Sequence, residues 1–259
     1  MHRGGRKQLR RPDGILIPRL CGMSQKNDNA LIVFLKYPET EKVKTRLGKD
    51  IGKQRAMELY RETASFVADS FSGSKNWTAF FFYTPRERKK EVFEWLGDKE
   101  GFFFAQGTGS LGQRMSRAFE KCFSLGFRNV VIIGTDCVMM TEEDLQRAFS
   151  LLSGEKFEAV LGPATDGGYY LLGLCRKTDA VFQDIQWSTS RVFKETERRI
   201  RGSGLRHAVM RELSDIDEEK DISIKDIMTR DMKLARRLEQ ILLKGQKNRT
   251  EKNEERKPV

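Results

Sequence analysis

The chain has 259 residues, a formal net charge of +11 at pH 7, four cysteines and two histidines. This length is sufficient for a full hydrophobic core, and the uniform composition of the body favours one large domain over two small ones. The two histidines, His2 and His207, leave almost no material for a histidine base or a Ser-His-Asp triad, and the cysteines lack the CxxC spacing of a zinc site.

Most of the positive charge lies in the two terminal segments. Residues 1–26 carry seven Lys and Arg against one Asp, and residues 244–259 carry six against three Glu, so that the body is nearly neutral. We therefore predict a basic disordered extension over 1–26, one folded domain over 27–243 and a charged disordered tail over 244–259. Tails that bind nucleic acid are the less favoured alternative. The apolar stretch at residues 15–20 is too short to span a bilayer, which favours a cytoplasmic protein.

Apolar runs alternate with helical periodicity along the body. We predict strands from residue 30 and at 78–84, 101–105 and 130–134, with helices at 50–71, 85–97 and 111–125 between them. Further along we expect strands at 158–163, 169–174 and 206–213, a helix from an N-cap at Ser188 to Ile200, and a long helix at 222–243. Continuous apolar strands that alternate with helices predict an α/β fold with a mostly parallel sheet covered by helices on both faces.

The first predicted strand runs into a loop that is rich in cations. Lys36, Lys44 and Arg46 lie in this loop, and ammonium and guanidinium groups are suited to offset the charge of phosphates. A solvated surface loop remains the simpler alternative. We predict that these three residues bind the phosphate groups of a nucleotide.

Carboxylates follow two other predicted strands. Asp136 comes directly after the apolar run at 130–134, and the helix that follows has its own predicted cap in Thr141 and Asp144, which leaves Asp136 free. Asp215 and Asp217 follow the last strand, where helix capping is an equal alternative. Because ligands bind beyond the carboxyl ends of parallel strands, we predict that Asp136, with Asp217 and Asp215, binds Mg²⁺ or Mn²⁺.

Two glycine-rich segments complete the candidate site. A turn at 164–168 precedes a strand that begins with Tyr169, and we predict that Asp166, Gly167, Gly168 and Tyr169 bind an acceptor substrate, with Asp166 also catalytic; a plain hairpin turn is the alternative. Residues 107–115 lack the spacing of a P-loop or of a dinucleotide fingerprint. Their helix start offers Gly112 and Arg114 as nucleotide-binding residues.

In chain order, the motifs KxPxxxxVKTRL, LGxRM, GTDC, GPATDGGYYLLGL, WST and DID run through the body. Together they resemble the arsenosugar-biosynthesis-type glycosyltransferases, a GT-A-fold family within the nucleotide-diphospho-sugar transferase superfamily. The resemblance implies a Rossmann-like GT-A domain that binds a nucleotide and a divalent metal, with Asp136 as the matching metal aspartate. More distantly, the KxxxVKTRL segment is similar to the loop of 2-phospho-lactate guanylyltransferases.

These observations favour a metal-dependent glycosyltransferase that takes a nucleotide-diphospho-sugar donor and a small-molecule acceptor. The alternative within the same fold is a nucleotidyltransferase that transfers a nucleoside monophosphate from an NTP to a phosphorylated acceptor. An accessory protein that binds nucleic acid through its basic tails is the alternative from another class. The WST segment at 187–189 is more typical of a helix cap than of a catalytic group.

Overall fold

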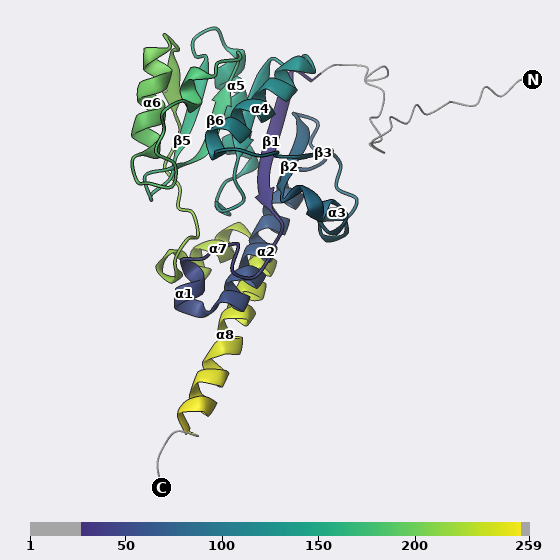
Figure 1. Ribbon diagram of the computed structural model, residues 1–259, viewed down its shortest axis with the longest axis vertical. Helices are drawn as coiled ribbons and strands as arrows, with labels where there is room; N and C mark the ends of the chain where they lie inside the picture. The colour runs from purple at the N-terminus through teal and green to yellow at the C-terminus, as the bar shows by residue number, and fades with distance from the viewer. Residues whose placement is uncertain (1–26, 255–259) are drawn as a thin grey trace, which may run out of the picture.

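The computed structural model describes residues 27–254, which form a seven-stranded sheet, helices on both of its faces and a helical cluster at one end (Figure 1). The strands are β1 (Asn29–Lys36), β2 (Thr78–Thr84), β3 (Phe102–Ala105), β4 (Asn129–Ile133), β5 (Ala159–Pro163), β6 (Tyr169–Leu174) and β7 (His207–Val209). Their order across the sheet is β3-β2-β1-β4-β6-β5-β7. Only β6 runs against its neighbours, β4 and β5, so the predicted mostly parallel α/β fold is confirmed.

The sheet is buried on both faces because successive side chains of its apolar strands point in opposite directions. Leu31 and Val33 of β1 face one core, which is covered by α2 (Lys53–Phe71), α3 (Lys89–Leu96) and α5 (Glu142–Ser153). Ala30 and Ile32 face the other core, which is covered by α4 (Leu111–Ser124) and α6 (Val192–Gly202). The helices therefore form the two outer layers of an α/β/α sandwich.

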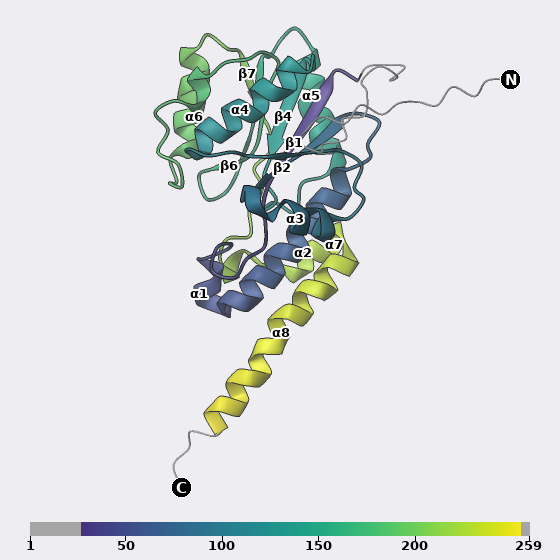
Figure 2. The ribbon, with the colours of Figure 1, turned by 45° about the vertical axis from the view of Figure 1, so that its right-hand side comes forward.

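A third core lies beyond one end of the sheet, among helices far apart in sequence. It joins α1 (Leu47–Ile51) and the start of α2 to α7 (Ile224–Arg230) and α8 (Met232–Glu254), and α8 extends away from the sheet (Figure 2). Val138 and Ile216, from the loops after β4 and β7, are also buried in this core. The third core thus anchors two loops where the sheet meets the helices: the loop after β4, which carries Asp136, and the loop after β7, which carries Asp215 and Asp217. These are called the two aspartate loops below.

Several predicted boundaries differ from the structure. The helix predicted at 50–71 is two helices that meet at Gly52, whose φ of 93° interrupts the helical path. The prediction of one long helix at 222–243 is also wrong. The segment forms two helices, α7 and α8, because the chain is extended at Asp231 between them. Ser188 is not the N-cap of α6: its φ is 65°, and α6 begins after Arg191. The last strand is limited to His207–Val209.

The predicted C-terminal limit of the folded domain differs from the structure. The last helix continues to Glu254, beyond the predicted limit at residue 243. The disordered extension predicted over 1–26 and the last five residues of the predicted tail lie outside the described residues. Between residues 27 and 254, none of the helices combines the length and the apolar composition that a membrane crossing would require.

Candidate functional site

A cavity of about 710 Å³ opens at the carboxyl ends of β1 and β4, where the sheet meets the helical cluster. Its volume is within the range of small-molecule sites. Most of the predicted site residues line it, although they come from five separate segments of the chain: Lys36, Lys44, Arg46, Arg114, Asp136, Asp166, Gly168, Tyr169, Asp215 and Asp217. The sequence-based expectation that these segments converge is therefore met in space, while their chemical roles stay predictions.

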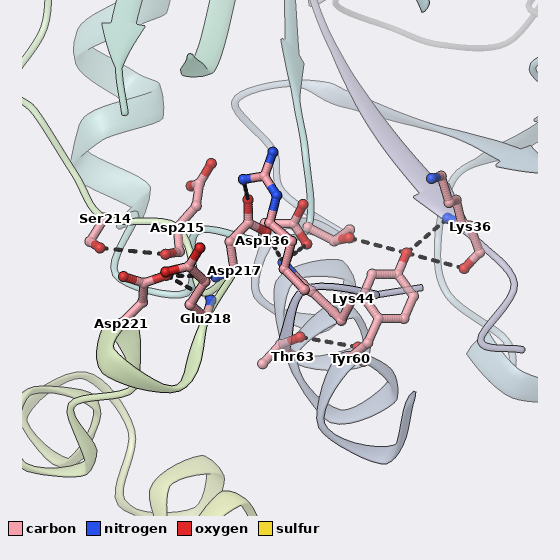
Figure 3. A network of polar contacts seen from close by, with 12 residues as sticks. Lys36, Lys44, Tyr60, Thr63, Asp136, Ser214, Asp215, Asp217, Glu218 and Asp221 are labelled. Atoms are coloured by element: carbon pink, nitrogen blue, oxygen red, sulfur yellow. Dashed lines mark hydrogen bonds and ion pairs between the residues drawn. The ribbon is translucent and has the colours of Figure 1, made fainter. Parts of the chain in front are cut away.

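The loop after β1 turns one lysine inward. Val43 is buried against Tyr60 and Ala64, which anchors the middle of the loop. Lys44 then adopts a φ of 47°, a left-handed conformation that costs a non-glycine residue about 1 kcal/mol. The Nζ of Lys44 reaches Asp136 Oδ1 at 2.7 Å and Asp217 Oδ1 at 2.9 Å, and only 4% of the side chain is exposed (Figure 3).

The two aspartate loops are tied together through their backbones. Ile216 donates its N–H to the carbonyl oxygen of Asp136 at 3.1 Å and buries its side chain in the third core. Side chains two positions apart in an extended segment point in the same direction, and Asp215 and Asp217 accordingly both line the cavity. Asp221 holds this loop by accepting the N–H groups of Asp217 and Glu218 at 3.1 and 2.8 Å.

The carboxyl groups of Asp136, Asp215 and Asp217 lie close together, and the ammonium of Lys44 contacts two of them. Burial raises the pKa of Asp215 to about 8, and the negative charge of Asp136 adds to this effect. The Oδ1 of Asp215 is buried without a hydrogen-bond partner. Burial disfavours the charge of Lys44, but Asp136 and Asp217 outweigh it and raise the pKa of this lysine above its ordinary value. Lys44 is therefore an ammonium ion that serves as the internal counter-ion of two carboxylates.

The remaining cations of the cavity are open to an anionic ligand. Lys36 is exposed, and neither it nor Arg114 forms an ion pair within the described part of the chain. Burial lowers the pKa of Arg114, the charge of Arg117 adds to this, and the Nε of Arg114 is buried without a partner. Arg46 is 55% exposed and lies 3.8 Å from Asp217. Lys36 and Arg114, and the exposed Arg46 despite its long ion pair with Asp217, are therefore more accessible to phosphate than Lys44 in this conformation.

The fit of a divalent cation depends on the carboxylates. Among residues 27–254, no three His, Cys, Asp or Glu side chains are gathered closely enough to hold a metal by themselves. Mg²⁺, however, is commonly held by one or two carboxylates with substrate phosphates and water as the other ligands. The orphaned Oδ1 of Asp215 and the neighbouring Asp136 supply oxygen atoms of this kind. The residues present therefore fit a cation that phosphate helps to hold.

The hairpin between β5 and β6 forms another wall of the cavity. Asp166 is exposed at its tip and accepts the N–H of Gly168 at 2.8 Å, as expected for a turn. Tyr169 lines the cavity, but its hydroxyl is directed at Met115 Sδ, 3.7 Å away. Tyr170 points to the opposite face, where its hydroxyl donates to the carbonyl oxygen of Arg211. Tyr169 thus offers ring surface rather than a hydroxyl to a ligand.

Two predicted binding glycines are placed differently from our prediction. Neither Gly112 nor Gly167 lines the cavity. A Cβ at Gly112 would lie 2.7 Å from the Trp187 ring, and a Cβ at Gly167 would lie 2.1 Å from the Ser190 carbonyl oxygen. Both glycines therefore allow the loop at 187–190 to pack closely against the hairpin and α4, a reason that a linear sequence does not reveal.

We expect Gly112→Ala to lower the free energy of unfolding by about 1–3 kcal/mol, because the new methyl group overpacks against Trp187 and the Phe182 carbonyl. Chemical denaturation measures this change. Gly202→Ala is the matched control, since a Cβ there meets no atom within 4 Å. Equal stability of the two variants would contradict the packing role of Gly112.

Sequence reasoning missed several residues of the cavity wall. Gln106 is buried, donates to the carbonyl oxygens of Leu35 and Phe82, and accepts Arg114 Nη1 at 2.5 Å, so it orients that guanidinium. The Tyr60 hydroxyl accepts the N–H of Lys36 and donates to its carbonyl oxygen, which holds the end of β1. Trp187 and the three residues after it also line the cavity. Only the WST motif gave a sequence signal for any of them.

Comparisons with known proteins agree with this architecture. A family model described as an uncharacterized protein conserved in bacteria (DUF2064) matches residues 67–189. The chain is 29% identical to a protein of Desulfovibrio desulfuricans G20 that is provisionally assigned as a nucleotide-diphospho-sugar transferase; the crystal structure superposes with a TM-score of 0.75 over 85% of this chain and 98% of that one. No curated protein matches the chain.

A more distant likeness concerns the fold alone. The 4-diphosphocytidyl-2C-methyl-D-erythritol synthase of Anaerococcus prevotii DSM 20548 is 10% identical, with a TM-score of 0.51 over 78% of this chain and 96% of that one. The chain thus has an α/β fold of the nucleotide-transferase type, with a mostly parallel seven-stranded sheet.

Proposed function

We propose that the protein is a metal-dependent glycosyltransferase that uses a nucleotide-diphospho-sugar donor and a small-molecule acceptor, of the kind that the motifs resemble. The observation that carries this proposal is one cavity lined both by aspartates from the loops after β4 and β7 and by Lys36 of β1 and Arg114 of α4, which form no ion pair within residues 27–254. The similarity to the provisionally assigned nucleotide-diphospho-sugar transferase supports the donor class.

In this proposal the cations bind the donor. Lys36, Arg46 and Arg114 offset the charge of the two phosphates, and Gln106 keeps the guanidinium of Arg114 in place. Asp136 and Asp217, with Asp215 beside them, would hold Mg²⁺ or Mn²⁺, which when bound neutralises the charge that develops on the diphosphate leaving group.

The acceptor side of the cavity is the hairpin between β5 and β6 with the loop at 187–190. Asp166, exposed at the hairpin tip, would accept a proton from an acceptor hydroxyl. Ser188 and Ser190 line the same wall and carry hydroxyl groups, and half-buried Trp187 lies beside them. Hydroxyls, a carboxylate and an aromatic ring together suit a polar small-molecule acceptor.

The test is to incubate the protein with Mn²⁺ and either UDP-glucose or labelled GTP, each with a mixture of small-molecule acceptors, and to identify the released product. We expect a nucleoside diphosphate from the nucleotide sugar, because the proposal places the diphosphate in the leaving group. Release of pyrophosphate from GTP instead would favour nucleotidyl transfer. Binding of neither nucleotide in a thermal-shift panel of nucleotides and nucleotide sugars would remove the proposal.

A further inference from the structure

Lys44 lies at the centre of the polar network of the cavity. Its ammonium group contacts Asp136 and Asp217 at 2.7 and 2.9 Å, while Asp215 lies beside them with an unpartnered oxygen (Figure 3). The same carboxylates are those that a divalent cation would need. The Lys44 ammonium and a metal ion cannot both lie between Asp136 and Asp217, because two positive charges in contact with the same carboxylates would repel each other.

Lys44 is far less exposed to solvent than Arg46, another cation of the cavity. Its side chain is 4% exposed, whereas that of Arg46 is 55% exposed, and Asp136 keeps 43% of its side chain open to the cavity. An ammonium that leaves its carboxylates at a buried position carries a large desolvation cost unless another anion receives it. Lys44 therefore leaves the carboxylates at low free-energy cost only toward an anion in the cavity that it lines, and without such an anion only when a high concentration of a competing cation displaces it.

We propose that Lys44 is a placeholder cation that occupies the divalent-cation position between Asp136 and Asp217, and that it is released from this position when its ammonium transfers to a phosphate group of the incoming nucleotide. The nucleotide part of this inference rests on the proposed function, while the occupancy of the metal position by Lys44 does not. The exchange keeps the local charge balanced, since the divalent cation replaces Lys44 on the carboxylates and the phosphate replaces the carboxylates on Lys44.

Such an exchange couples the two ligands thermodynamically. The wild-type protein alone should bind Mn²⁺ weakly, because binding must displace a buried ammonium. A nucleoside diphosphate should raise the Mn²⁺ affinity, and Mn²⁺ should raise the affinity for the nucleoside diphosphate by the same factor, which typical coupling energies place at about 5- to 150-fold.

The experiment is a Mn²⁺ titration of the full chain, with free Mn²⁺ measured by electron paramagnetic resonance, in the absence and presence of UDP or GDP. We expect Lys44→Met to bind Mn²⁺ without nucleotide at least about 10-fold more tightly than wild type, and to show a smaller enhancement by nucleotide, because only the direct contact between phosphate and Mn²⁺ remains. Lys42→Met is the matched control: it removes a cation of the same loop that pairs with Glu39 and does not line the cavity, and it should leave Mn²⁺ affinity within about 2-fold of wild type.

The outcomes separate the inference from the proposed function. Mn²⁺ binding by Lys44→Met that is no tighter than wild type overturns the placeholder role, whatever the substrate. Tighter Mn²⁺ binding in Lys44→Met without any effect of UDP, GDP or a nucleotide sugar on wild type supports the placeholder and removes the proposed donor class instead.

A second measurement uses the wild-type chain, so that it does not depend on the folding of a variant. Amine acetylation followed by mass spectrometry reports how accessible Lys44 is. Saturating Mn²⁺ should increase the acetylation of Lys44, whereas the exposed Lys36 should react equally with and without the metal. Unchanged acetylation of Lys44 at saturating Mn²⁺ would show that the ammonium stays in place and would overturn the inference.

Discussion

Asp136→Asn should reduce kcat for transfer by about 10³-fold, because an amide cannot neutralise Lys44 and is a much weaker ligand for a divalent cation, so the charge on the leaving diphosphate would be poorly stabilised. Asp136 lies at the carboxyl end of the central strand β4, in contact with Lys44 and beside Asp215.

Steady-state kinetics with the donor identified by product release measures this effect. The variant should be less stable than wild type, because the buried ammonium of Lys44 loses its contact with Asp136 and keeps that with Asp217, so kcat is calculated per mole of folded protein. Asp69→Asn, on α2 and outside the cavity, is the control for the substitution itself and should keep full activity. A kcat of Asp136→Asn close to that of wild type would exclude both the glycosyl and the nucleotidyl transfer hypotheses.

The sequence predicted the sheet because its signal is local. The apolar run that becomes β4 stops at a carboxylate, and Thr141 with Asp144 forms the predicted capping box, so the rim position of Asp136 follows from neighbouring residues. Asp215 and Asp217 were placed on one side by the alternation of an extended segment, and both line the cavity. These features depend on residues within a few positions of each other.

The parts that the sequence did not predict depend on long-range contacts. Lys44 was expected to bind phosphate, but in space its ammonium group is held by Asp217, 173 positions away, and by Asp136. Gly112 and Gly167 have the appearance of ligand-binding glycines, yet their missing side chains make room for Trp187 and Ser190. The breaks at Gly52 and Asp231 arise where α1, α2, α7 and α8 bend to share the third core.

A second large effect concerns stability rather than turnover. We expect Asp215→Asn to raise the free energy of unfolding of the metal-free protein at pH 8.5 by at least about 2 kcal/mol. Burial raises the pKa of Asp215 to about 8 from its ordinary value of 3.8, and the charge of Asp136 adds to this, so the fold favours the protonated form. Carboxyl groups whose ionised form is disfavoured by the fold are typical of functional sites, where activity is gained at the expense of stability.

The direction of the pH dependence follows from the two pKa values. Below pH 3.8 the carboxyl group is protonated in both the folded and unfolded states and costs nothing, whereas between pH 4 and 8 only the folded state keeps its proton. The wild type therefore loses stability from this group as the pH rises through that window, and the loss is complete above pH 8. The amide that replaces the carboxyl group does not titrate, so the stability advantage of Asp215→Asn should grow from pH 5 to pH 8.5.

Urea denaturation of the two proteins at pH 5, 7 and 8.5 in the presence of EDTA measures this difference. A double-mutant cycle identifies its cause: in an Asp136→Asn background the gain from Asp215→Asn should shrink, because one of the causes of the raised pKa is already removed. Added Mn²⁺ should stabilise wild type more than Asp215→Asn, since the cation neutralises the carboxylate and binds only the folded state. Parallel stability curves for the two proteins across this pH range would show that Asp215 is not strained in the fold.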